Sequence, residues 1–90
     1  MTKRSKIRRF SLNDLKAGNL YRWVPTDYRS WVPFFNVVDL NRSSDPPEAN
    51  TVMMYLGTDK TSGITGYMFL IGDQKFEVYN DDFCFGLRAA

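Results

Sequence analysis

The chain has 90 residues, of which 43% are hydrophobic and 16% aromatic, and its formal net charge is +2. This composition is that of one small globular domain, and no stretch approaches the roughly 18 apolar residues that a membrane-spanning helix needs. The sequence has no histidine and one cysteine, Cys84, so it excludes an intramolecular disulfide and lacks the commonest general base. We therefore expect no enzymatic activity, no bound metal and no cofactor.

The chain opens with a basic arm, MTKRSKIRRF, in residues 1–10, and we expect one domain over residues 11–90. No acid precedes Asp14, and residues 10–90 carry seven basic and ten acidic groups, so the body has about three net negative charges. The segment after the arm is polar, unlike the apolar core of a secretory signal, which predicts a cytoplasmic location and no membrane contact. The cations of the arm are Lys3, Arg4, Lys6, Arg8 and Arg9.

The pattern behind the arm is mostly that of short strands. Residues 11–16 predict a short helical turn, which Ser11 can cap and Gly18 can end. Strands are then predicted over residues 19–24, 34–40, 51–57, 64–72 and 75–79, each bounded by Gly, Pro, Asn or Asp. Residues 80–88 give another turn and leave room for a short last strand.

Five short strands behind a helical turn predict a mainly β fold, either a small barrel or a curved antiparallel sheet. The stretch LKAGNLYRW places Leu15, Gly18 and Tyr21 in an L-x-x-G-x-x-Y pattern that leads into the first strand. This pattern, and the order of long loops followed by tight turns, resembles SH3-like barrels over residues 12–85. The chain is also similar in size and aromatic content to small accessory proteins encoded by phages.

Two strands are apolar on both faces, although a barrel interior takes one face of each. We expect a core formed by Leu20, Val38, Val52, Leu56, Met68, Leu70, Phe76 and Val78. The opposite face and the aromatic loops are then candidates for partner binding, and these residues are Trp23, Tyr28, Trp31, Met53, Tyr55, Tyr67 and Phe69. Alternatively, the helical turn, the arm, a loop or a second copy of the chain covers that face.

Chemical motifs are weak. Cys84 lies between two phenylalanines, which favours a buried thiol over a nucleophile. Asp81 and Asp82 are typical turn formers. Lys60 follows Asp59 rather than the glycine of a phosphate-binding loop, so a hairpin turn is the better interpretation.

Our leading hypothesis is a non-enzymatic protein-binding module. The phage resemblance implies that it modulates or inhibits a host or defence protein in the host cytoplasm. The first alternative is a nucleic-acid-binding barrel, in which the basic arm holds phosphates and Trp23, Tyr28 or Trp31 stacks on bases. Further alternatives are a self-assembling structural subunit and, ranked last, a small ligand pocket or hydrolase built on loop carboxylates.

Overall fold

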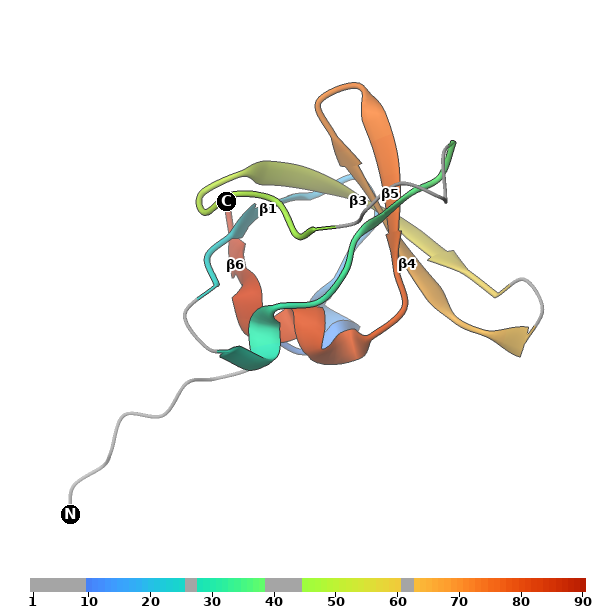
Figure 1. Ribbon diagram of the computed structural model, residues 1–90, viewed down its shortest axis with the longest axis horizontal. Helices are drawn as coiled ribbons and strands as arrows, with labels where there is room; N and C mark the ends of the chain where they lie inside the picture. The colour runs from blue at the N-terminus through green and yellow to red at the C-terminus, as the bar shows by residue number, and fades with distance from the viewer. Residues whose placement is uncertain (1–9, 26–27, 39–44, 61–62) are drawn as a thin grey trace, which may run out of the picture.

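The computed structural model describes residues 10–25, 28–38, 45–60 and 63–90. These residues form a mainly β domain with one six-stranded antiparallel sheet and three short 3-10 helices (Figure 1). The strands are β1 (Leu20–Trp23), β2 (Phe35–Asn36), β3 (Val52–Asp59), β4 (Gly66–Ile71), β5 (Gln74–Val78) and β6 (Leu87–Ala89). The 3-10 helices are η1 (Leu12–Asp14), η2 (Tyr28–Ser30) and η4 (Asp81–Gly86). The predicted mainly β class is confirmed.

The strands are hydrogen-bonded in the order β2-β5-β4-β3-β1-β6, so the sheet is open, with β2 and β6 at its edges. β3, β4 and β5 form an up-and-down meander, and β1 lies between β3 and β6. Between β1 and β3 the chain crosses to the far edge, where β2 pairs with β5. The sheet thus has one strand more than the five expected, and β2 covers only two residues of the strand predicted over 34–40.

The predicted N-terminal turn is present and shorter than expected. The hydroxyl oxygen of Ser11 accepts a hydrogen bond from the backbone N–H of Asn13 at 3.2 Å, which caps η1. Gly18 follows with φ +92°, a conformation that residues with a side chain rarely adopt. The N–H of Phe10 donates to the carbonyl of Cys84 at 3.1 Å, so the start of the domain is attached to η4.

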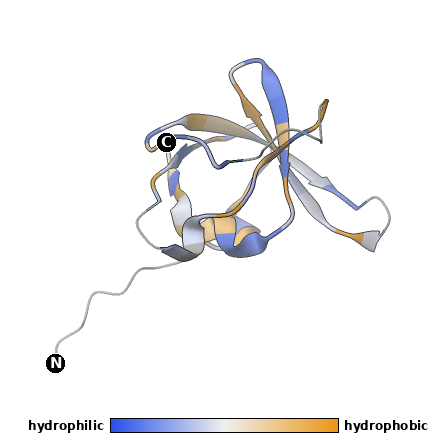
Figure 2. Cartoon of the chain, in the orientation of Figure 1, coloured by the Kyte–Doolittle hydropathy of each residue, from blue (hydrophilic) through white to orange (hydrophobic). Residues whose placement is uncertain are grey.

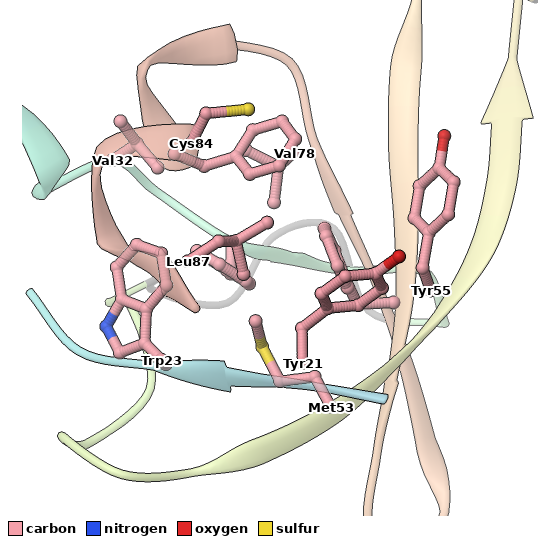
Figure 3. Packing of buried hydrophobic residues seen from close by; sticks show 11 residues of the cluster. Tyr21, Trp23, Val32, Met53, Tyr55, Val78, Cys84 and Leu87 are labelled. Carbon is pink, nitrogen blue, oxygen red and sulfur yellow. The ribbon is translucent and has the colours of Figure 1, made fainter. Parts of the chain in front are cut away.

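The core lies between the inner face of the sheet, η4 and the segment 30–34 (Figure 3). Aromatic rings make up much of it: Trp23 meets Phe34 edge-on at 5.2 Å between centroids, and Phe69 meets Phe83 edge-on at 5.5 Å. Such pairs add stabilisation beyond the area that they bury. The buried hydrophobic residues are Tyr21, Trp23, Val32, Phe34, Met53, Tyr55, Phe69, Val78, Phe83, Cys84 and Leu87.

The predicted core is wrong in its choice of sheet face. Of its eight residues, Val78 is buried and Phe76 packs against the core. Leu20, Val38 and Val52 are exposed. Leu56, Met68 and Leu70 are half-buried, outside the buried cluster.

The size of the side chains explains why the other face of the sheet is buried. Alternation along a strand shows that two faces differ, but it does not show which is inside when both are apolar. The buried face carries Tyr21, Trp23, Tyr55 and Phe69, and an aromatic side chain buries about 150–250 Å². Burying the aromatic face therefore removes more apolar surface from water than burying the aliphatic face.

Candidate functional site

Four of the seven predicted partner-binding residues are core residues. Trp23, Met53 and Phe69 are fully buried and Tyr55 is nearly so, which corrects the expectation that they form a surface. Tyr67 is half-buried, and its ring lies 5.1 Å from that of Phe83. Only Tyr28 and Trp31 remain exposed. The five cations of the basic arm lie outside the described residues.

Tyr28 and Trp31 form an exposed aromatic pair at η2, and the two residues are 88% and 61% exposed. The N–H of Trp31 donates to the carbonyl of Tyr28 at 3.2 Å, which closes the turn. Ser30 and Val32 are buried on either side of Trp31 and anchor the segment. The two rings are therefore exposed on a segment whose neighbouring residues are buried in the domain.

Several aliphatic residues that were predicted for the core, among them Leu20, Val52 and Leu70, lie together on the outer face of the sheet. Directly opposite residues of an antiparallel pair share a face. Leu20 of β1 pairs with Met54 of β3, Met54 with Leu70 of β4, and Leu70 with Lys75 of β5. We call Leu20, Met54 and Leu70, with Lys75 at the β5 end, the aliphatic row. Leu20 is 50% exposed, and the hydrophobic colour follows the first half of β3 in Figure 2.

A second row runs beside the aliphatic row on the same face. Arg22 of β1 pairs with Val52 of β3 on one side and with Arg88 of β6 on the other. Val52 is 42% exposed and extends the apolar surface of the aliphatic row. The guanidinium of Arg88 donates to the carbonyls of Phe85 and Leu87 at 3.2 and 2.7 Å, so it is held at the edge of the sheet. We call these two rows together the outer patch.

The next row of the outer face, on the side toward β5 and β2, has a different character. Met68 pairs with Glu77, and Glu77 with Phe35, whose ring lies 5.7 Å from that of Tyr79. The hydroxyl of Tyr79 donates to a carboxylate oxygen of Glu77 at 3.1 Å. Desolvation, and then this hydrogen bond, raises the pKa of Tyr79 above its ordinary value. Glu77 is buried against Gly66, where a Cβ atom would overlap its carboxylate. We interpret these contacts as structural, because they hold β4 and β5 together.

Cys84 and the paired acids Asp81 and Asp82 have structural explanations. Cys84 is buried in the core, as its phenylalanine neighbours predict. The side chain of Asn80 accepts from the N–H of Asp82 at 2.9 Å and caps η4, which places Asp81 and Asp82 in a helical turn. Within the described ranges, no group of three potential ligands is arranged to hold a metal ion. No helix in the same ranges is long and apolar enough to cross a membrane.

The chain has no match among protein-family models, curated proteins or solved structures. The interpretation of the site therefore depends on its own geometry. Sequence reasoning missed the outer patch, although its signal was present. The two apolar faces of residues 51–57 and 64–72 already implied that one face stays outside.

Proposed function

We propose that the chain is a non-enzymatic protein-binding module that engages its partner through the outer patch. The observation that supports this proposal is the aliphatic row, in which Leu20, Met54 and Leu70 meet across three strands with solvent access. Single exposed apolar residues are ordinary, but contiguous ones mark interaction sites. Binding of a partner would be favoured because it removes the apolar surface of this row and of Val52 from water together.

We also propose that the domain is a variant of the SH3-like arrangement. Its support is the order of the connections: a long excursion after β1, then the meander of β3, β4 and β5, with a tight turn at Gly72. The resemblance to small phage proteins suggests a host or defence protein in the host cytoplasm as the target. Binding would then modulate or inhibit that target.

The proposal is tested by site-specific photo-crosslinking in a lysate of the cells that make the protein. A benzophenone amino acid replaces Val52 in the outer patch, Tyr28 at η2, or the exposed Asp45 as a control. We expect one dominant crosslinked protein from position 52, which disappears when Leu20→Glu is added. Position 45 should give background only.

The same experiment separates the competing surfaces. Crosslinks from position 28 alone would move the binding site to the aromatic pair at η2 and contradict the outer patch. A product with twice the mass of the chain would favour the self-assembling subunit. Equal yields from positions 52 and 45 would refute a specific site on the outer patch.

A further inference from the structure

We infer that the outer patch binds an acidic segment of a different protein, with aliphatic side chains at its centre and carboxylates around them. This inference rests on the proposed function and specifies the partner. It starts from the charged members of the patch, Arg22, Lys75 and Arg88, which are all cations. They are three of the seven basic residues in positions 10–90, a region that carries ten acids. The patch therefore has the opposite sign to the body that presents it.

The cations bracket the apolar strip at both ends. Lys75 ends the aliphatic row at β5, whereas Leu20 ends it at β1, next to Arg22. Three strand spacings, about 14 Å at 4.7–4.9 Å each, separate Leu20 from Lys75, and Arg22 lies about 7 Å further along β1, so about 16 Å separate Arg22 from Lys75. A segment with carboxylates about 16 Å apart and aliphatic groups between them would match both cations, which corresponds to about five extended residues.

Arg22 adds a reason for an anionic occupant. It stands directly opposite Arg88, and like charges in this position destabilise a strand pair. Arg88 is turned toward the carbonyls of Phe85 and Leu87, whereas Arg22 has no ion pair with any residue that the structure describes. A partner carboxylate at Arg22 would neutralise this charge and gain a bidentate contact.

Other occupants fit the patch less well. The basic arm of this chain has the same sign as the patch. A second copy placed across a two-fold axis would bring its own basic patch against this one, since a two-fold interface pairs a surface with itself. Of the outer-face acids, Glu77 lies two residues from Lys75 but is buried and already bonded to Tyr79, and Asp59 lies at the far end of β3. Charge complementarity thus favours a separate acidic partner.

The test uses the full-length protein and a display library of random 16-residue peptides as the probe. We expect the enriched peptides to be net acidic with aliphatic residues between the acids. The affinity of a synthetic selected peptide should fall about tenfold or more for Arg22→Glu and for Lys75→Glu, which corresponds to about 1.4 kcal/mol. It should also weaken as salt is raised.

A matched control tests whether the loss of affinity is specific to the outer patch. Lys60→Glu makes the same charge change beyond the end of β3, six residues from Met54 and about 20 Å along the strand. We expect this variant to bind like the wild type. The melting temperature of each variant shows whether it is folded, and because Arg22 and Lys75 lie on different strands, at least one reversal should leave the sheet intact.

Several results would overturn the inference. These are a library that yields no binders or yields basic or neutral ones, loss of binding with Tyr28→Ala rather than Arg22→Glu, and a dimer that Val52→Glu dissociates. Its failure is distinguishable from failure of the proposed function. If the crosslink from position 52 persists in the Arg22→Glu/Lys75→Glu variant, the patch binds a protein and only the acidic chemistry is wrong.

Discussion

Trp23 sets how closely η4 approaches β1. Its ring is fully buried, and Gly86 at the end of η4 lies against it, so that a Cβ atom at residue 86 would be 2.8 Å from the indole carbons Cζ3 and Cη2. The indole N–H is buried and has no hydrogen-bond partner among the residues that the structure describes. A buried polar group without a partner is costly, so the packing of this ring must offset that cost. We therefore assign Trp23 to stability rather than to partner binding.

Gly86→Ala should destabilise the domain by about 1–3 kcal/mol, because the added methyl group forces the ring or η4 to move. Urea unfolding of the variant would measure the change in free energy. The same substitution in a Trp23→Phe background removes part of the opposing ring, and there the added cost should be smaller. Equal costs in both backgrounds would show that Trp23 is not what excludes a side chain at residue 86.

Tyr55 gives the domain an alkaline pH dependence. Burial, followed by the nearby Tyr67, Cys84 and Tyr21 side chains, raises the pKa of Tyr55 above its ordinary value of 10.0. The unfolded chain therefore loses this proton at lower pH than the folded one, so stability falls as pH rises above about 10. Tyr55→Phe should flatten part of the fall in the urea midpoint between about pH 9 and pH 11. A parallel fall in wild type and variant would contradict this assignment.

At the scale of elements, β3 shows what the sequence determines and what it leaves open. A strand over residues 51–57 is predicted from its apolar residues and flanking breakers and is present as Val52–Asp59, and the predicted turn at Ser11 follows from its capping side chain. The strand's orientation was not determined, because Met53 and Met54 are chemically identical neighbours on opposite faces. Which methionine is buried depends on residues far away in sequence, chiefly Phe83 and Leu87, which belong to the same core cluster as Met53.

The candidate site was likewise predictable from the sequence only in part. Tyr28 and Trp31 were predicted as partner-binding candidates in an aromatic loop, and they are exposed. The outer patch needs the register of five strands, which sequence alone does not provide. η4 was expected only as a turn, although Asn80 before two acids is a typical cap for a helical segment.

The two methionines provide a matched pair for testing the orientation of β3. Met53→Ala should cost about 2–5 kcal/mol because its side chain is fully buried and leaves a cavity. Met54→Ala should cost at most about 1 kcal/mol, since its side chain is only half-buried. Chemical denaturation measures both. A larger loss for Met54 would mean that the aliphatic row, not the aromatic face, is the core.

At the scale of the whole molecule, charge is divided between regions. The basic arm holds five cations, while residues 10–90 have three more acids than bases. The exposed aromatic pair at η2 is separate in sequence from the cations of the outer patch, which lie beside aliphatic residues. Stacking on bases calls for rings along a cationic groove, and the outer patch offers aliphatic side chains instead. This distribution suits an acidic protein segment better than a nucleic acid.

The basic arm can be tested directly against nucleic acid. We expect the intact protein to show no appreciable affinity for duplex DNA or for RNA at physiological salt, because the body is net acidic. If the arm instead neutralised five phosphates of a duplex, the slope of log affinity against log salt would be about −4.5, from roughly −0.9 for each contact. Replacing its five cations with glutamine would then bring the slope close to zero, while capture of a protein partner at the outer patch would be unchanged. Tight, salt-sensitive DNA binding that this replacement abolishes would make the nucleic-acid hypothesis the leading one, because counterion release at the arm would then account for recognition without the sheet.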